Sequence, residues 1–324
     1  MSLHQENEKW MRRCIHLAMN GAQNAAPNPM VGAVIVHEGK ILGEGYHICC
    51  GKAHAEVNAI NSVKPAERHL LKESTIYVSL EPCAHYGRTP PCAELIVRTG
   101  IPRVVIGCKD PFAKVAGRGI DILRRAGIEV TVGVLEQECL RLNRAFITAQ
   151  TKGRPFITLK WACSADGFIG AWNDDAPAPV AISTPLSLLR VHHLRTTHQA
   201  ILVGHRTLLS DSPSLTVRHW VGRQPLRIVL GRVAEGELPA GFEAFADIDT
   251  MLASLHRRGI QSLLVEGGQQ TLQSFIDLGL WDEAWEEVSD KPLGEGIPVP
   301  KMPVGVTRRC ERAFGVSLTH WENS

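Results

Sequence analysis

The sequence has no apolar run long enough to span a bilayer, and its first ten residues are polar, without the apolar core of a secretion signal. It carries no strong excess of either charge: the formal net charge is +2 over 324 residues. It also lacks a basic stripe with interleaved aromatic residues, the pattern typical of nucleic-acid-binding proteins. We therefore expect neither a nucleic-acid partner nor a membrane partner.

The cysteines do not form the pattern of a disulfide framework. Their number, nine, is odd, they are spread unevenly, and no secretion signal precedes them. This predicts a reducing, cytoplasmic compartment. Two of them, Cys83 and Cys92, belong to the motif described next. We expect the other seven to be small buried hydrophobic side chains: Cys14, Cys49, Cys50, Cys108, Cys139, Cys163 and Cys310.

Two short stretches together supply the ligands of a catalytic zinc site. They are His54-Ala-Glu56 and the run that contains Cys83 and Cys92, with a proline before each cysteine. Three protein ligands leave the fourth position of a tetrahedral zinc ion open for water. The pattern resembles H-x-E followed by P-C-x-x-C of zinc nucleobase deaminases, with a longer gap between the cysteines. We predict that His54, Cys83 and Cys92 hold Zn²⁺ and that Glu56 is the general acid and base.

Other interpretations of these residues remain open. A structural zinc site would need a fourth protein ligand, for which His85 is the nearest candidate. A non-enzymatic zinc module would have no use for Glu56, because structural zinc needs no general base. A nucleic-acid-editing deaminase with an accessory domain is disfavoured by the near-neutral charge.

The length suggests one large or two medium domains, and Thr151-Lys-Gly-Arg-Pro155 is a plausible linker. In the first half, strand and helix patterns alternate from residue 74 to residue 132, so part of the sheet should be parallel. Cys83 should begin a helical turn there. We expect helices over 8–23, 54–63, 92–99 and 117–126, and strands over 30–36, 41–47, 74–80, 103–108 and 129–132.

The second half shows a similar alternation. Glu266-Gly267-Gly268 before a helix suits a phosphate group, because glycines let backbone N–H groups face an anion, although a tight turn alone would explain it. Residues 210–218 should form a turn and an extended segment, and the chain should end in a short tail. We expect strands over 156–164, 200–204, 226–230 and 262–266, and helices over 183–196, 249–258 and 270–278.

Nearly all of residues 8–150 resembles the deaminase domain of the bifunctional riboflavin-biosynthesis deaminase–reductase family. The resemblance rests on Pro27-Asn-Pro-Met-Val-Gly32, Gly43-Glu-Gly-Tyr-His47, the H-A-E stretch, and Glu81-Pro-Cys-Ala-His-Tyr-Gly-Arg-Thr-Pro-Pro-Cys92. The long insert between the cysteines distinguishes this family from cytidine and tRNA-adenosine deaminases. The resemblance implies hydrolysis of the ring amine of a ribosylaminopyrimidine 5′-phosphate, with substrate contacts from Asn28, His47 and Arg88.

The second half resembles the reductase domain of the same family. The matching stretches are Thr158-Leu-Lys160, Ser164-x-Asp-Gly167, Ala200-Ile-Leu-Val-Gly204, Asp211-x-Pro-Ser-Leu-Thr-Val-Arg218 and Leu264-Val-Glu-Gly-Gly268. The resemblance implies a fold like dihydrofolate reductase and hydride transfer from NADPH to the sugar. It implies substrate contacts from Lys160, Arg195, Leu215 and Arg218, and NADPH contacts from Ala162, Thr207, Asp211, Glu266 and Gly268.

The sequence thus predicts two α/β domains: a cytidine-deaminase-like three-layer α/β/α domain in residues 1–150 and a dihydrofolate-reductase-like domain in residues 151–324. Relatives form homo-oligomers, so we expect a dimer or larger. The second half departs from the family pattern at Ala181, where a tryptophan is common, and at Gly231-Arg232, where Asp-Ser is common. An active deaminase with a degenerate, assembly-only reductase domain is therefore the alternative.

Overall fold

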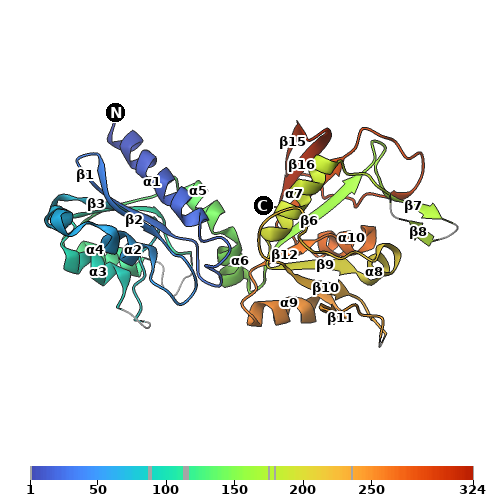
Figure 1. Ribbon diagram of the computed structural model, residues 1–324, viewed down its shortest axis with the longest axis horizontal. Helices are drawn as coiled ribbons and strands as arrows, with labels where there is room; N and C mark the ends of the chain where they lie inside the picture. The colour runs from blue at the N-terminus through green and yellow to red at the C-terminus, as the bar shows by residue number, and fades with distance from the viewer. Residues whose placement is uncertain are drawn as a thin grey trace. The chain divides into compact units, whose positions relative to one another are not determined.

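The computed structural model describes residues 2–86, 90–111, 117–173, 176–178, 180–234 and 236–323. Contacts divide the chain into two compact units, Met1–Lys152 and Gly153–Ser324 (Figure 1). No described helix is long and apolar enough to cross a membrane. Each unit is built around its own sheet.

The first unit has a five-stranded sheet in the order β2-β1-β3-β4-β5. The β1–β2 and β1–β3 pairs are antiparallel, whereas β3–β4 and β4–β5 are parallel, as the alternation of strands and helices predicts. The strands are β1 (Gly32–His37), β2 (Lys40–Tyr46), β3 (Thr75–Leu80), β4 (Arg103–Cys108) and β5 (Glu129–Val132).

Helices cover both faces of this sheet, which gives three layers (Figure 1). Successive strand residues point to opposite faces. On β1, Ile35 packs into the core with α2–α4, whereas Val34 packs into the core that contains Trp10 of α1. The helices are α1 (Leu3–Met19), α2 (Ala55–Ser62), α3 (Cys92–Thr99), α4 (Arg118–Arg125), α5 (Glu136–Leu142) and α6 (Arg144–Lys152), with a 3₁₀ helix over Pro65–Glu73.

Two local details of the first unit differ from the sequence prediction. Helix α1 begins earlier than expected, because Ser2 and Gln5 form a reciprocal capping box at its N-terminus. The prediction that Cys83 begins a helical turn is wrong. Residues 81–84 have no regular structure, and the Cys83 carbonyl instead accepts the N–H of Ala93 in the first turn of α3. That helix begins at Cys92, directly after two prolines, the second of which, Pro91, is its N-cap.

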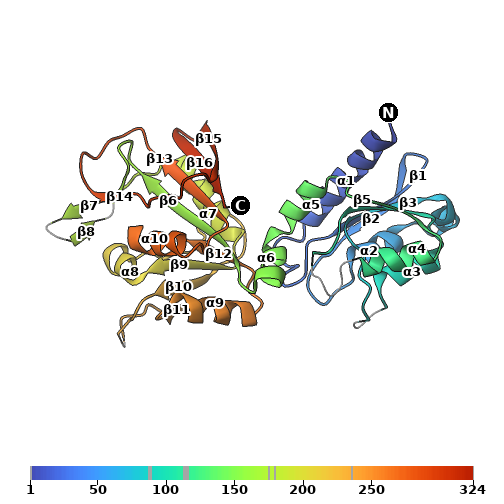
Figure 2. The ribbon, with the colours of Figure 1, turned by 180° about the vertical axis from the view of Figure 1, so that it is seen from behind.

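The second unit has an eight-stranded sheet in the order β11-β10-β9-β12-β6-β13-β16-β15, and a small sheet β14-β7-β8 (Figure 2). Every neighbouring pair from β11 to β13 in this order is parallel. The β13–β16 and β16–β15 pairs are antiparallel. The strands are β6 (Phe156–Cys163), β7 (Phe168–Asn173), β8 (Ala176–Ala178), β9 (Ala200–Gly204), β10 (Leu226–Leu230), β11 (Phe242–Phe245), β12 (Ser262–Val265), β13 (Glu283–Val288), β14 (Ile297–Pro298), β15 (Thr307–Ala313) and β16 (Val316–Glu322).

Helices pack on both faces of the large sheet as well. Met251 of α9 and Leu272 of α10 join the core on one face, and Leu208 of α8 joins the core on the other, with Leu194 of α7 packed against it. The helices are α7 (Pro185–Thr196), α8 (His205–Asp211), α9 (Ile248–Arg257) and α10 (Gln269–Asp277). The predicted turn at residue 210 is therefore wrong in part, because α8 continues to Asp211 before the chain leaves regular structure.

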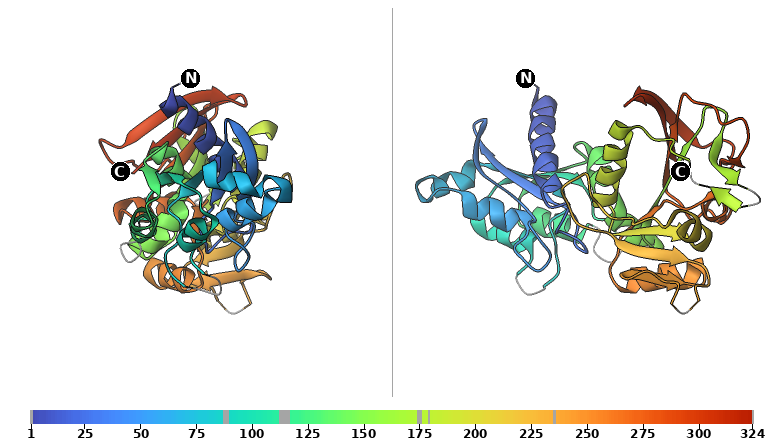
Figure 3. Two further views of the ribbon diagram at one scale, coloured as in Figure 1. Left: turned by 90° about the vertical axis from the view of Figure 1, so that its left-hand side faces the viewer. Right: turned by 45° about the vertical axis from the view of Figure 1, so that its right-hand side comes forward.

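The prediction of a short C-terminal tail is wrong, because this part of the chain forms two strands of the main sheet, β15 and β16. The β15–β16 hairpin, red in Figure 3, lies at one edge of that sheet. Acidic residues hid β13 from the pattern. Glu283 is buried but accepts a hydrogen bond from Thr158 at 3.0 Å, and Glu287 is buried against the Ser187 hydroxyl at 2.6 Å. Nearly every residue of β15 is exposed, so it has no apolar alternation to detect.

The prediction for the seven remaining cysteines holds in part. Four are buried, as expected: Cys14, Cys108, Cys139 and Cys163. It is wrong for Cys50 and Cys310, which are exposed, and Cys49 is half-buried. Cys50 lies in the loop between β2 and α2, and Cys310 lies in the exposed edge strand β15.

Candidate metal centre and cofactor cavity

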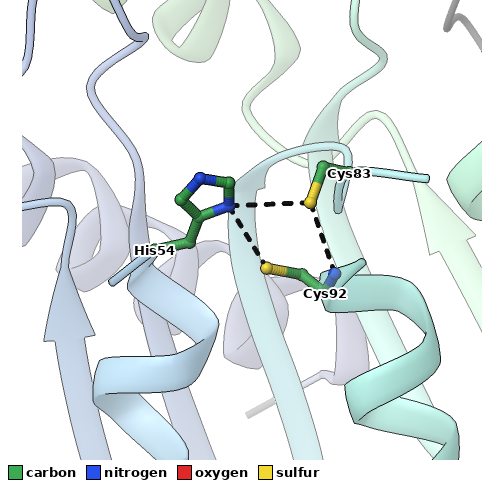
Figure 4. Close-up of side chains that lie close together, drawn as sticks. All are labelled: His54, Cys83 and Cys92. Carbon is green, nitrogen blue, oxygen red and sulfur yellow. Dashed lines mark hydrogen bonds between the residues drawn. The ribbon is translucent and has the colours of Figure 1, made fainter. Parts of the chain in front are cut away.

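Three separate elements bring His54, Cys83 and Cys92 together. His54 is the N-cap of α2, Cys83 lies in the loop after β3, and Cys92 is the first residue of α3. Their ligand atoms all lie within 4.8 Å of one another. The His54 Nδ1 atom is 3.3 Å from the Cys92 sulfur and 3.6 Å from the Cys83 sulfur (Figure 4). The loop and two helix starts thus converge on one point.

The donor set fits a zinc ion with one open position. Imidazole nitrogen and thiolate sulfur are the ligands that zinc prefers, and three of them are present. The hydrogen bond from Cys92, followed by that from His54, lowers the pKa of Cys83 to about 4, so a thiolate is available for a metal. His85, the alternative fourth ligand, is exposed and outside the group. This geometry favours a catalytic over a structural metal site.

Glu56 lies in the first turn of α2, and its side chain is buried next to the cysteines. Burial, helped by the negative charge of Cys83, raises the pKa of this carboxyl to about 7. A carboxyl that titrates near neutral pH can both take and return a proton. It lines a cavity of about 220 Å³ together with His54, Cys83 and two predicted substrate residues, Asn28 and His47.

His47 is arranged differently from a phosphate ligand. It is 3% exposed, and burial lowers its pKa, so the ring is neutral at neutral pH. Its Nδ1 atom is 3.1 Å from the carbonyl oxygen of Ala53, which only accepts. Nδ1 therefore donates, and Nε2 accepts from the Asn28 amide nitrogen at 3.1 Å. His47 thus fixes which way the Asn28 amide faces. Arg88 lies outside the described residues.

A larger cavity, about 830 Å³, opens in the second unit. Its size is that of a cofactor site. Six of the predicted residues line it: Lys160, Ala162, Thr207, Asp211, Glu266 and Gly268. At Gly268 the backbone N–H donates to the Thr207 hydroxyl at 3.0 Å, and a Cβ there would lie 2.9 Å from that oxygen. A side chain at Gly268 would force Thr207 to shift, and the turn opens on the cavity.

The remaining three predicted substrate residues are not among the described residues that line this cavity. Arg195 lies behind Glu266 and donates to its carboxylate twice, at 3.0 and 2.7 Å. Leu215 is buried with a left-handed backbone (φ 51°), and the Arg218 guanidinium contacts the side chains of Ser214 and Thr216. Burial tends to raise the pKa of Glu266, but Arg195 outweighs it, so the pKa is lowered and the carboxylate stays charged.

The two residues that depart from the family pattern, Ala181 and Gly231, lie in different surroundings. Ala181 lines the cavity, so the smaller side chain leaves more room there. Gly231 has φ 132°, and a Cβ at this position would lie 2.9 Å from the His205 Cβ. Sequence reasoning gave no role to two other lining residues, Glu81 in the metal cavity and Trp172 in the larger one. A glutamate before a proline and a lone tryptophan in a strand have no distinguishing signal.

Comparison with known proteins matches both units. The cytidine and deoxycytidylate deaminase zinc-binding region matches residues 4–108, and the RibD C-terminal domain matches residues 155–300. The riboflavin biosynthesis protein RibD of Aquifex aeolicus is 37% identical, with 98% of this chain and 95% of the relative covered. The RibD protein of Escherichia coli is 34% identical, with 89% of each chain covered.

A solved structure from Thermotoga maritima is similar over all of both chains, with a TM-score of 0.88 and 35% identity. It is described as a diaminohydroxyphosphoribosylaminopyrimidine deaminase/5-amino-6-(5-phosphoribosylamino)uracil reductase. These similarities confirm the predicted fold class, a cytidine-deaminase-like unit followed by a dihydrofolate-reductase-like unit.

Proposed function

Since the chain belongs to the RibD family of bifunctional deaminase–reductases of riboflavin biosynthesis, we propose that its two units act in turn on one phosphorylated pyrimidine. The first hydrolyses the ring amine of 2,5-diamino-6-ribosylamino-4(3H)-pyrimidinone 5′-phosphate and releases ammonia. The second reduces the ribosyl group of the deaminated uracil to a ribityl chain. Zinc and NADPH are the cofactors.

The observation that carries the deaminase proposal is the buried Glu56 beside the His54, Cys83 and Cys92 group. These three residues would hold zinc, which when bound lowers the pKa of a water ligand toward neutrality. Glu56 takes a proton from the attacking water and returns it to the departing amine, so that ammonia leaves and a carbonyl remains. With its nitrogen turned to His47, the Asn28 amide has its oxygen left to accept from an N–H of the pyrimidine.

The reductase proposal depends on the larger cavity. NADPH supplies the hydride, and the chain binds and orients it. Glu266 and Lys160 both line this cavity, and their opposite charges attract each other. Lys160 would meet the anionic group of the sugar phosphate. The same cavity contains Ala181, whose smaller side chain motivates the alternative of a degenerate, assembly-only reductase domain.

One coupled assay distinguishes a bifunctional enzyme from a deaminase with an assembly-only reductase domain. The full chain is supplied with the pyrimidine substrate and NADPH, and ammonia release and NADPH oxidation are followed together. Our proposal predicts both signals, with oxidation lagging behind ammonia. Ammonia without oxidation, also when the deaminated uracil is supplied directly, would favour the assembly-only alternative. Absence of both signals would contradict the proposal.

We further infer that the chain forms a homo-oligomer through its second unit. Leu186 and Leu189 are exposed one turn apart on α7. The Thr184 hydroxyl donates to the Phe314 carbonyl at 2.8 Å, which brings a third exposed apolar side chain beside the start of this helix. Exposed apolar patches of this kind typically mark association surfaces. Light scattering of the purified chain would detect a dimer or larger species, and a monomer would contradict the inference. The cytoplasmic location stays a prediction.

A further inference from the structure

Glu81 lies between β3 and the metal-ligand loop, and it is 7% exposed. Its carboxylate accepts four backbone N–H groups. The closest donors are Gly119 at 2.9 Å and Gly117 at 3.0 Å, and the other two are Asp110 at 3.3 Å and Ile120 at 3.4 Å. A buried carboxylate requires such partners, and charge-assisted hydrogen bonds are stronger than neutral ones.

The two carboxylate oxygens divide these donors in an informative way. Oε2 accepts from Asp110 and from Gly117, so one atom holds both of these backbone N–H groups. Oε1 accepts from Gly119 and Ile120 in the first turn of α4, where a negative charge is favourable. Glu81 therefore holds both Asp110 and the start of α4.

A second, independent contact presses α4 against the same place. A Cβ on Gly119 would lie 2.0 Å from the carbonyl oxygen of Pro82. The start of α4 thus touches the backbone immediately before the metal ligand Cys83. Glu81 and Pro82 thus place the start of α4 beside the metal loop, and Glu81 also holds Asp110 there.

Asp110, which Glu81 holds, lines the metal cavity together with Glu81. We propose that Glu81 is a positioning residue of the deaminase: its carboxylate holds Asp110 at the cavity wall, where the Asp110 carboxylate accepts N–H or O–H groups of the substrate. This inference rests on the proposed deaminase function. A residue that only supported the fold would not change substrate affinity.

The test is steady-state ammonia release by Glu81→Gln in the full chain. The new amide places an NH₂ group against N–H donors, so Asp110 loses its position. We expect the KM for the pyrimidine to rise roughly tenfold or more, which corresponds to about 1.4 kcal/mol of binding free energy. The zinc content should remain that of the unaltered chain, and kcat should change less than KM.

Two further variants make the result specific. In an Asp110→Ala background, Glu81→Gln should raise KM no further, because the effect acts through Asp110. Asp247→Asn is the matched control: this carboxylate also accepts a backbone N–H, from Thr250 at 2.8 Å, but at the N-cap of α9. It should leave the KM for ammonia release unchanged. An unchanged KM in Glu81→Gln, or an equal rise in both backgrounds, would overturn the inference.

One measurement needs no variant and therefore does not depend on how well the variants fold. Hydrogen exchange of the unaltered chain should be slow at the Gly117 and Gly119 amides, which donate to Glu81. Fast exchange at both would overturn the inference. The two proposals can fail separately, because an unaltered chain that released no ammonia would contradict the deaminase function and leave the exchange result standing.

Discussion

The Arg195 guanidinium and the Glu266 carboxylate form a two-pronged ion pair, with Nε–Oε1 at 3.0 Å and Nη2–Oε2 at 2.7 Å. Both side chains are nearly buried, at 12% and 11% exposure. Glu266 lines the cofactor cavity, whereas Arg195 is not among the described residues that do so. The arginine is therefore placed to hold the glutamate charged and in position.

We predict that Arg195→Ala destabilises the second unit by about 3–5 kcal/mol, because it leaves a buried charge without its partner. Urea unfolding followed by tryptophan fluorescence measures this loss. Six of the seven tryptophans lie in the second unit and only Trp10 lies in the first, so the fluorescence reports mainly on unfolding of the second unit. The control is Arg258→Ala, which breaks an exposed pair with Glu243 of the same two-pronged type. That loss should be below about 1 kcal/mol. Equal losses in the two variants would contradict the role of burial.

The sequence alone was enough to group the three candidate metal ligands, because their chemistry depends on residue type, and the structure brings them together. His54, Cys83 and Cys92 were identifiable as a zinc set before their distances were known, and the pairing of Ile35 with one core and Val34 with the other follows from strand alternation. The ligand set is recognised by residue type, although His54 lies 29 and 38 positions from the two cysteines, and the two strand faces are recognised by local alternation.

The burial of acidic side chains was not predictable where their partners lie far away in the sequence. Strand β13 reads as polar because of Glu283 and Glu287, whose partners are Thr158 and Ser187, more than 90 positions away in the chain. The pairing of Arg195 with Glu266 across 71 positions is of the same kind. No local pattern indicates that such acidic side chains are buried.

His47 should act through Asn28 rather than through a phosphate group. We predict that His47→Ala and Asn28→Ala each raise the KM for the pyrimidine, and that the double variant is no worse than Asn28→Ala alone. Zinc content should be unchanged in all three, because neither side chain belongs to the metal group. The measurement is ammonia release against substrate concentration. Additive effects would show that His47 contacts the substrate independently.

Zinc removal should separate the two activities. A chelator should abolish ammonia release, because the metal that His54, Cys83 and Cys92 would hold is needed to activate the attacking water. NADPH oxidation with the deaminated uracil should persist, since the described residues that line the reductase cavity all belong to the second unit. Added zinc should restore ammonia release. A parallel loss of both activities on chelation would contradict this independence.

Asp166 should contribute to acid sensitivity of the second unit. Its carboxylate accepts from the Ser164 hydroxyl at 2.6 Å and from the N–H groups of Leu293 at 3.0 Å and Gly294 at 2.7 Å. These bonds, that from Ser164 most strongly, lower its pKa from 3.8 to about 2. A lowered pKa stabilises the folded state above pH 3.8, and this contribution disappears as the pH falls toward 2. Asp166→Asn should therefore lower the melting temperature at pH 7 and reduce its fall between about pH 4 and 2. The same fall of the melting temperature with pH in Asp166→Asn and in the unaltered chain would contradict this prediction.

The most direct test of the deaminase mechanism is Glu56→Gln, measured for zinc content and ammonia release in the same preparation. Glutamine preserves the size of the side chain but cannot take a proton, so zinc should stay bound while ammonia release falls by about 10²–10⁴-fold. Glu94→Gln, in the first turn of α3, is the matched control and should release ammonia at the unaltered rate. Unchanged ammonia release by a zinc-loaded Glu56→Gln chain would contradict the central claim.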